Sequence, residues 1–258
     1  MICNFSNVAF YAFGLPIHWY SLAYIFGIVI ALKLSVFFSR KLETKIATHL
    51  FDDFVSAAIV GIILGGRLGH VFFYDFDYYI RFPTEILKIW KGGMSFYGGF
   101  IGVIGVTYIF CKKHNIAFLK FIDLWSVSVP VGLFLGRIAN FINAELLGKE
   151  SHVPWNVVFR DGIHRHPSQL YEAFLEGLLL FLIMLISFHN KCHKHSGRLS
   201  GIFCVGYGSG RFLAEFFRKA DSRFSSELLY YSGLNLNQYL SIVMILLGIV
   251  LIARSRKL

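Results

Sequence analysis

The sequence has few charged residues for its length. Of its 258 residues, 16% are Asp, Glu, Lys or Arg, whereas soluble domains contain about 25% of these types. The shortage excludes an ordinary soluble composition, and 56% hydrophobic residues with a mean hydropathy of +0.60 indicate a membrane protein. The net charge of +10 does not indicate a nucleic-acid partner, because the basic residues form short clusters between apolar runs.

Cysteine is also scarce. Cys3, Cys111, Cys192 and Cys204 show no spacing that is typical of a metal site or a disulfide framework. The start of the chain has no basic residue before Lys33, so it lacks the basic region of a cleaved signal peptide. We therefore expect no metal, and we expect the first apolar run to remain as a membrane span.

Seven apolar runs are long enough to be considered as spans, since a helix needs about 20 residues to cross the hydrocarbon core. They cover residues 17–38, 54–74, 94–110, 121–141, 167–188, 199–217 and 238–253. Glycines crowd the third run, which fits either close helix packing through small residues or a chain that bends beside a cavity. The sequence predicts an all-α polytopic membrane protein with about seven transmembrane helices, forming one domain over residues 1–258.

Basic residues in the connections predict the orientation. One set of alternate connections, together with the C-terminal tail, has twelve basic residues, against nine in the other set. The twelve are Arg40, Lys41, Lys45, Lys112, Lys113, Lys120, Lys191, Lys194, Arg198, Arg254, Arg256 and Lys257. Since basic residues favour the inner side, we expect the N-terminus outside and the C-terminus inside. The long outer connection, residues 144–166, predicts a small head between the fourth and fifth spans.

Three arginines, Arg67, Arg137 and Arg211, interrupt the apolar runs. Such residues normally face the protein interior and mark function, and a guanidinium matches the oxygens of a phosphate. Internal ion pairing is the alternative, since Arg211 has Glu215 four residues later on the same helix face. Arg137 has no acidic residue within one helical turn, so its charge needs a partner from elsewhere, for which a lipid phosphate is a candidate.

The segment GRIANFINAELLG, residues 136–148, is the most specific pattern in the chain. It places Arg137, Asn140, Asn143 and Glu145 in a fixed register at the end of an apolar run. With this segment the sequence resembles the prolipoprotein diacylglyceryl transferase family. The resemblance covers nearly the whole chain and includes HWY at 18–20, GGR at 65–67, GGMSFYGG at 92–99, HPSQLYE at 166–172, the arginine-containing run at 207–218 and QYLS at 238–241.

The resemblance implies a multi-pass enzyme of the bacterial inner membrane, with a periplasmic N-terminus and head and a cytoplasmic C-terminus. Family members move the diacylglyceryl group of phosphatidylglycerol to the lipobox cysteine of a prolipoprotein. A thioether forms and glycerol 1-phosphate leaves, which is the first step of bacterial lipoprotein maturation. The implied partners are phosphatidylglycerol, the lipobox peptide and membrane lipids, without nucleic acid and without a cofactor.

The resemblance also implies site residues. The residues expected to bind substrate are Arg137, Asn140, Asn143, Glu145, Tyr20, Arg67 and Tyr207. The residues expected to take part in catalysis are Arg137, Arg211, Tyr97 and His166. Positioned arginines stabilise the charge that develops on the leaving phosphate. We expect Pro167 at the first helical position of the fifth span, with Gln169 and Glu172 facing the bundle interior.

Tyr97 departs from the family pattern, which usually has histidine at this position. A neutral tyrosine has a pKa near 10 and is a poor base at neutral pH, so a histidine base is not available here. The candidate proton acceptors are His166, His18, Tyr97 and water.

Two other classes of function stay open from the sequence alone. An anion transporter would use the arginines along a path, but the chain shows no internal repeat of the kind that transporters often have. A non-catalytic phospholipid-binding membrane protein would bind the lipid without turnover.

Overall fold

The computed structural model of the protein describes residues 5–42, 46–219 and 233–257. Lys45, one of the twelve basic residues named above, and Arg223, one of the nine in the other set, lie outside the described residues. Contacts divide the chain into two compact units, which are described separately. The first comprises Met1–Phe37 with Asp123–Leu258, and the second comprises Phe38–Ile122.

Helices dominate both units, as the apolar runs predict. The long helices are α1 (Trp19–Lys41), α2 (His49–Phe73), α4 (Phe96–Lys113), α5 (Phe118–Ile142), α7 (Leu180–His189), α8 (Arg198–Ala214) and α10 (Leu236–Arg254). Shorter helical segments are α3 (Phe76–Arg81), η1 (Pro83–Leu87), η2 (Ile89–Lys91), α6 (Ser168–Glu172), η3 (Ala173–Leu179), η4 (Cys192–Lys194) and η5 (Glu215–Phe217). The strands are β1 (Val8–Ala12), β2 (Leu15–His18), β3 (Val157–Val158), β4 (His164–Arg165), β5 (His195–Ser196) and β6 (Arg256–Lys257), which pair antiparallel as β1–β2, β3–β4 and β5–β6.

Each predicted apolar run coincides with helix, so the helical class is confirmed. Within the described ranges, five helical stretches are long and apolar enough to cross a membrane. They are Trp19–Lys41, His49–Phe72, Phe118–Ile142, Ser168–His189 and Leu236–Arg254. The third and sixth runs form α4 and α8, which are helical but do not belong to this set of five. Membrane crossing by these two helices therefore remains a prediction.

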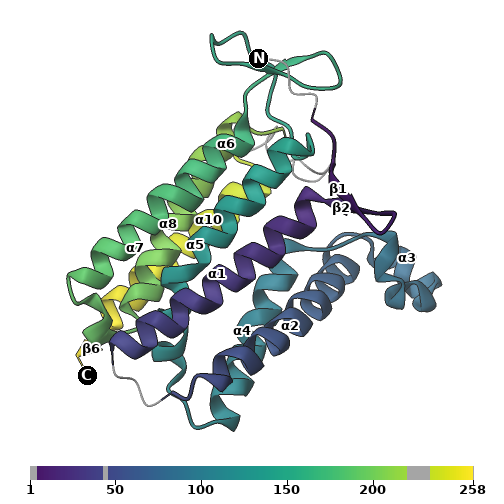
Figure 1. The fold of residues 1–258 in the computed structure, drawn as a ribbon. Coiled ribbons are helices and arrows are strands. Elements are labelled where there is room, and N and C mark those ends of the chain that lie inside the picture. The colour runs from purple at the N-terminus through teal and green to yellow at the C-terminus, as the bar shows by residue number, and fades with distance from the viewer. Residues whose placement is uncertain (1–4, 43–45, 220–232, 258) are drawn as a thin grey trace. The chain divides into compact units, whose positions relative to one another are not determined.

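Small residues join the helices of each unit. In the second unit α2 and α4 lie side by side (Figure 1), and a Cβ added at Gly98 would lie 2.8 Å from the Cα of Gly69. Gly65 and Gly102 face each other with equally little room. Of the two predictions for the third run, close packing through small residues is therefore confirmed over most of it. The preceding Gly92 forms a turn with a left-handed φ of 84°.

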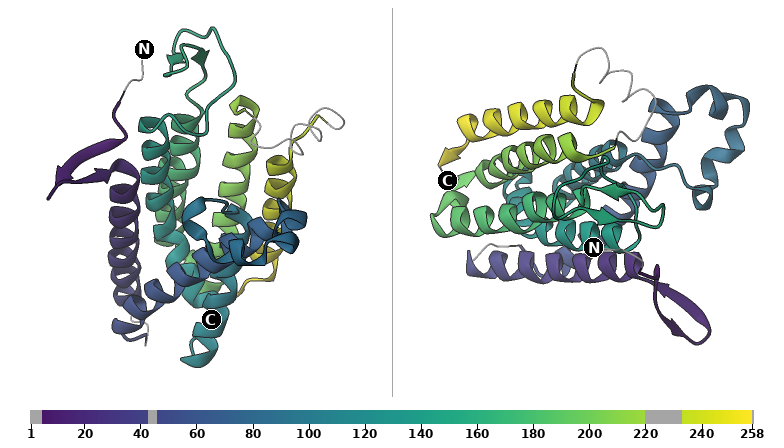
Figure 2. Two further views of the ribbon diagram at one scale, coloured as in Figure 1. Left: turned by 90° about the vertical axis from the view of Figure 1, so that its right-hand side faces the viewer. Right: turned by 90° about the horizontal axis from the view of Figure 1, so that it is seen from above.

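The first unit is a bundle in which α1, α5, α7, α8 and α10 run alongside one another (Figures 1 and 2). Ser35 of α1 donates a buried hydrogen bond to Ser128 of α5, with their hydroxyl oxygens 3.0 Å apart. At the start of α8 the carboxylate of Asp123 accepts hydrogen bonds from the backbone N–H groups of Gly197 and Ser200, at 2.7 and 2.8 Å. These donors have no partner within α8, so Asp123 both begins α8 and ties it to α5.

Residues 144–166 form a small layer beyond the end of α5, as Figure 2 shows. Phe141, Val157 and Phe159 make its apolar core. The chain enters it through Ala144 and Leu146, which both have left-handed backbone conformations. The structure of this segment agrees with a small head, whereas its periplasmic location remains a prediction.

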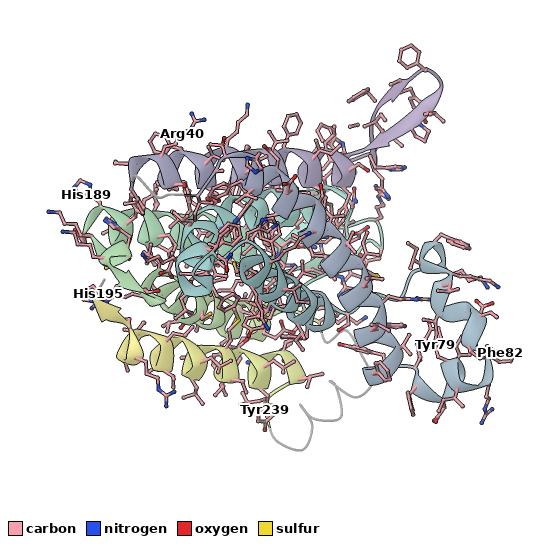
Figure 3. The ribbon with its side chains drawn as sticks, turned by 90° about the horizontal axis from the view of Figure 1, so that it is seen from below. Arg40, Tyr79, Phe82, His189, His195 and Tyr239 are labelled. Carbon is pink, nitrogen blue, oxygen red and sulfur yellow. The ribbon has the colours of Figure 1, made fainter. Side chains whose placement is uncertain are left out.

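The connection between α2 and α4 exposes many large apolar side chains. Tyr79 is the buried member of α3, whereas Phe82 directly after it is half exposed (Figure 3). Leu87 and Trp90 are more than three quarters exposed. Aromatic residues of this kind are enriched where a membrane meets water, so the segment suits an interfacial position next to α2.

Candidate functional site

Buried arginines and glutamates meet inside the helix bundle of the first unit. Arg137 of α5 places its Nη1 atom 2.9 Å from Oε2 of Glu172 and its Nη2 atom 3.1 Å from Oε2 of Glu176. Nη1 of Arg211 on α8 lies 2.9 Å from Oε1 of Glu172 and 3.6 Å from Oε1 of Glu176. Both glutamate side chains are fully buried. Two arginines from different helices therefore share one pair of carboxylates.

A second group of contacts extends this cluster toward α10. Nη2 of Arg211 lies 2.9 Å from Oε2 of Glu215, as the four-residue spacing predicts. Asn235 and Asn237 donate side-chain amide hydrogen bonds to Oε1 of Glu215, at 3.2 and 2.9 Å. Arg218 is also buried, and its Nη1 lies 3.4 Å from Oε1 of Glu172. The cluster thus joins five elements: α5, α6, η3, α8 with η5, and the start of α10.

Helix geometry brings these charges together. Gln169 and Glu172 of α6 are fully buried, which confirms the prediction that they face the bundle interior. Pro167 is the residue before α6, so the predicted first helical position is shifted by one to Ser168. The start of α10 has a capping box, in which Asn235 and Gln238 each accept a backbone hydrogen bond from the other. This box fixes Asn235 in its contact with Glu215.

The partners of Arg137 come from outside its own helix, as the sequence predicts. No acid lies within one turn of it on α5, but two carboxylates from α6 and η3 occupy its guanidinium. A lipid phosphate is therefore not needed to balance its charge. A phosphate that binds Arg137 must share or replace these carboxylate contacts. Hydrogen bonds from a guanidinium to a phosphate are charge-assisted, so they are strong enough to compete with those to a carboxylate.

The other residues of the 136–148 segment form the wall next to the head. The side-chain amide of Asn140 donates to Oε2 of Glu145 at 3.2 Å. The backbone carbonyl of Glu145 accepts from the side-chain amide of Gln169 at 2.6 Å, while the Glu145 side chain itself is exposed. The Oδ1 atom of Asn143 is buried and accepts no hydrogen bond from the described residues. Gly148 meets the backbone of His166 so closely that a Cβ has no room.

His166 lies at the edge of this wall. Its Nδ1 is 3.2 Å from the hydroxyl of Tyr171, which in turn accepts a 2.7 Å hydrogen bond from Nε1 of Trp155. Partial burial and the nearby Lys149 ammonium lower the pKa of the His166 imidazole from its ordinary value. The lowered pKa favours the neutral imidazole, which is the form that can accept a proton. His18, the other histidine considered, ends β2 and is exposed.

Two tyrosines of α1 lie near the charged cluster. The hydroxyl of Tyr24 donates to that of Tyr20 at 3.3 Å, and the ring centroids are 4.9 Å apart. Tyr24 interacts electrostatically with Arg137 and Glu145. On α8, the predicted Tyr207 is buried and interacts electrostatically with Arg137. The first unit therefore gathers most of the predicted site residues.

Arg67 and Tyr97 belong to the second unit. Tyr97 is the second residue of α4 and is half-buried. Arg67 is buried, and its five N–H donors are directed at five backbone carbonyls of the segment before α4. The accepting carbonyls belong to Glu85, Ile86, Lys88, Gly92 and Gly93. A lipid phosphate would have to displace some of them, so this geometry favours a loop-holding role for Arg67.

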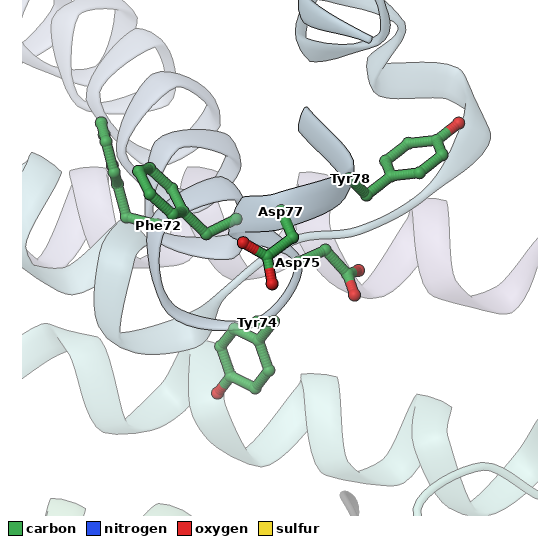
Figure 4. A pocket seen from close by; sticks show the side chains of 6 residues that line it. Phe72, Tyr74, Asp75, Asp77 and Tyr78 are labelled. Atoms are coloured by element: carbon green, nitrogen blue, oxygen red, sulfur yellow. The ribbon is translucent and has the colours of Figure 1, made fainter. Parts of the chain in front are cut away.

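A shallow hollow in the second unit is lined by Phe72, Tyr74, Asp75, Phe76, Asp77 and Tyr78 (Figure 4). Its lining residues carry two carboxylates and no basic group. The carboxylate of Asp75 lies 3.0 Å from Nε2 of His70. An anionic headgroup would be repelled by this lining, so the hollow does not compete with the arginine cluster as a phosphate site.

Sequence reasoning missed several members of the cluster. Glu176 stands four residues after Glu172, a spacing that places both carboxylates on one helix face and so offered a signal. Arg218 ends the arginine-containing run at 207–218, but it is buried because the chain turns after α8, which the sequence pattern does not indicate. Asn235 and Tyr24 gave no pattern of their own, because only tertiary packing brings them to the arginines.

The apolar helices and the buried arginine–glutamate cluster define an integral membrane protein with a charged site inside a helix bundle. Residues 7–254 match the profile of the prolipoprotein diacylglyceryl transferase family. The chain therefore belongs to this family.

Three relatives named phosphatidylglycerol–prolipoprotein diacylglyceryl transferase illustrate the similarity. The one from Azospirillum brasilense is 44% identical, over 97% of this chain and 94% of its own length. Those from Ehrlichia ruminantium (strain Welgevonden) and Wolbachia pipientis subsp. Culex pipiens (strain wPip) are 45% and 47% identical. They cover 98% and 96% of this chain, and the matches span 98% and 94% of their own lengths.

Proposed function

We propose that this chain is the transferase that moves the diacylglyceryl group of phosphatidylglycerol to the lipobox cysteine of a prolipoprotein. Membership of the family and relatives of that name over nearly the whole length support the activity. The structural observation that carries the proposal is the meeting of Arg137 and Arg211 on one pair of buried carboxylates. The two guanidinium groups are therefore neighbours, which supports a phosphate site that they share.

The reaction suits such a site. The cysteine sulfur attacks the glyceryl carbon that bears the phosphate, a carbon–sulfur bond forms, and the carbon–oxygen bond breaks with its electron pair on the phosphate oxygen. The leaving glycerol 1-phosphate gains negative charge as the bond breaks. Fixed guanidinium groups in a low-dielectric site stabilise that charge without rearrangement, which lowers the barrier. A positive environment also lowers the pKa of a nearby thiol, which favours the reactive thiolate.

We assign the residues as follows. Arg137 and Arg211 bind the phosphate, and Asn140, Asn143, Glu145, Tyr20 and Tyr207 surround the substrate. His166, whose imidazole has a lowered pKa, is a proton acceptor at the edge of the site. Tyr97 positions substrate rather than acting as a base. Arg67 acts indirectly, through the carbonyls of the segment before α4.

The finer topology is part of the proposal. We place seven spans in the bacterial inner membrane, with α4 and α8 added to the five helices that are long and apolar enough by themselves. The N-terminus and the 144–166 head are periplasmic and the C-terminus is cytoplasmic, as the basic connections indicate. The partners are phosphatidylglycerol, the lipobox peptide and the surrounding lipids.

A transfer assay tests the function. Purified protein is mixed with phosphatidylglycerol and a lipobox peptide, and mass spectrometry follows the peptide while a coupled assay follows glycerol phosphate. We expect both products in equal amounts. Tight lipid binding without either product would indicate a non-catalytic lipid-binding protein. The shared carboxylate pair of Arg137 and Arg211 gives no support to the transporter alternative, which needs arginines spaced along a path.

A further inference from the structure

We propose that Glu176 is a positioning residue that takes up a proton when the phosphate of the lipid substrate binds Arg137 and Arg211. This inference rests on the proposed function and extends it to a residue that lies outside the sequence motifs. The step is the protonation of one carboxylate by water, and no bond to carbon forms or breaks in it.

Glu176 occupies an unusual backbone position. It lies in η3, a seven-residue π-helical segment between α6 and α7, and its side chain is fully buried. π-Helical turns are rare in proteins, and those that occur often lie at functional sites. Ser168–His189 is also one of the five stretches apolar enough to span a membrane. A carboxylate at that depth is costly and marks function by default.

Two glycines hold Glu176 between the arginine-bearing helices. A Cβ on Gly177 would lie 2.8 Å from the Cα of Phe134, so η3 approaches α5 as closely as a backbone can. A Cβ on Gly210 of α8 would lie 3.6 Å from Cγ of Glu176 itself. The carboxylate therefore has α5 on one side and α8 on the other, which explains its contacts with both Arg137 and Arg211.

The charges of the cluster balance before a lipid phosphate is added. Glu176 is surrounded by charged and titratable groups from each element packed against it. They are Arg137 on α5, Glu172 on α6, Tyr207 and Arg211 on α8, with Glu215 of η5 and Arg218 beyond them. Three guanidinium groups face three carboxylates, so the net charge is zero when all are ionised. A phosphodiester adds one negative charge, and in a buried site one carboxylate is then protonated to restore neutrality.

Of the three carboxylates, Glu176 has the fewest contacts that stabilise its ionised form. Glu172 contacts three arginines, and Glu215 is bound by Arg211 and by two side-chain amides. Glu176 contacts only Arg137 and Arg211 among the described residues of the cluster, and its contact with Arg211 is 3.6 Å long. The carboxylate of Glu172 one helical turn earlier adds like-charge repulsion. When a phosphate takes over the guanidinium donors, Glu176 loses most of what keeps it ionised.

Calorimetry of lipid binding tests the proposal. At each of several pH values, the full-length chain in neutral detergent micelles is titrated with short-chain phosphatidylglycerol in two buffers that differ in ionisation enthalpy. We expect the wild type to take up about one proton per lipid bound. Its affinity for the lipid should fall by up to about tenfold for each unit by which the pH rises, over the range in which Glu176 is ionised in the free protein. Glu176→Gln should bind the lipid with no proton uptake and little pH dependence. Zwitterionic phosphatidylcholine is the ligand control.

Matched variants separate this role from a structural one. Glu150→Gln removes an exposed carboxylate outside the cluster, leaves its charge balance unchanged and should keep the proton uptake. Glu176→Asp keeps the titrating group and should restore the uptake, even if the helix packing is loosened. Proton-free binding by the wild type, or unchanged uptake by Glu176→Gln, would overturn the inference. If Glu176→Gln does not fold, proton-free lipid binding by the wild type still overturns the inference.

The two experiments distinguish a failure of this inference from a failure of the transferase proposal. If the wild type forms the thioether but binds lipid without proton uptake, only the role of Glu176 is wrong. If lipid binding takes up a proton through Glu176 but no thioether forms, the transferase proposal is wrong and the role of Glu176 remains.

Discussion

Nη1 of Arg137 lies 2.9 Å from Oε2 of Glu172, a fully buried carboxylate 35 residues later in the chain. Glu172 also contacts Arg211 and Arg218, so one side chain joins three guanidinium groups from two parts of the bundle. This relationship makes Glu172 the centre of the buried charge network.

Replacement of Glu172 by Gln should therefore destabilise the protein. The substitution leaves Arg137 and the buried Arg211 and Arg218 with fewer partners, and breaking a buried ion pair typically costs about 3–5 kcal/mol. Thermal unfolding in detergent micelles measures the effect. The matched control, Glu150→Gln, changes an exposed carboxylate and should shift stability by less than about 0.5 kcal/mol. Equal melting temperatures for the two variants would show that the network is not structural.

The glycine contact between α2 and α4 predicts a sharp difference between two similar substitutions. A Cβ at Gly98 would lie 2.8 Å from the Cα of Gly69, so Gly98→Ala should cost about 1–3 kcal/mol through overpacking. Gly105 on the same helix has nothing within 4 Å, so Gly105→Ala should be neutral or stabilise by up to about 1 kcal/mol. Unfolding of both variants under one condition checks the difference, and equal effects would contradict the packing described.

Much of this fold could be predicted from the sequence, because the span helices depend on local composition. Long apolar runs gave the helices, and the ion pair of Arg211 with Glu215 follows from a spacing of four residues within one helix. The partners of Arg137 could not be predicted in this way. They come from another helix, and their approach depends on Gly177 meeting Phe134 and on a π-helical turn, neither of which has a local sequence signal.

Arg67 is a second residue whose partners could not be predicted from the sequence. Its position inside an apolar run correctly predicts that it is buried. Its partners are backbone carbonyls of a connecting segment, which any sequence would supply, so no side-chain pattern could reveal them. The same type of residue in the same type of run thus has backbone partners at Arg67 and carboxylate partners at Arg137.

Transfer activity should tolerate loss of the Tyr97 hydroxyl. If the side chain only positions substrate, Tyr97→Phe keeps the ring and should retain substantial transfer activity, and Tyr97→His should be tolerated as well. Initial rates with phosphatidylglycerol and a lipobox peptide measure this. A complete loss of activity in well-folded Tyr97→Phe would show that the hydroxyl is essential, and the assignment of Tyr97 as a positioning residue would be wrong.

The proposed topology predicts where reporter fusions will be found. Reporters attached after Lys45, Lys113 and Lys194 should be cytoplasmic, because these positions follow the basic connections of the inner set. A reporter attached within 144–166 should be periplasmic. Pairs of enzymes that are active on only one side of the membrane measure each position, and a periplasmic result at any of the three lysines would reverse the orientation.

The central claim is that Arg137 binds the phosphate of phosphatidylglycerol during transfer, and the rate of glycerol 1-phosphate release by Arg137→Lys tests it most directly. Lysine keeps the charge but cannot offer two donors in one plane. The loss of one charged hydrogen bond, about 1.5–3 kcal/mol, corresponds to a roughly ten- to hundredfold slower rate. We expect at least this loss, and a near-total loss for Arg137→Ala, while the exposed Arg254→Lys should match the wild type. Wild-type turnover by well-folded Arg137→Ala would contradict the account.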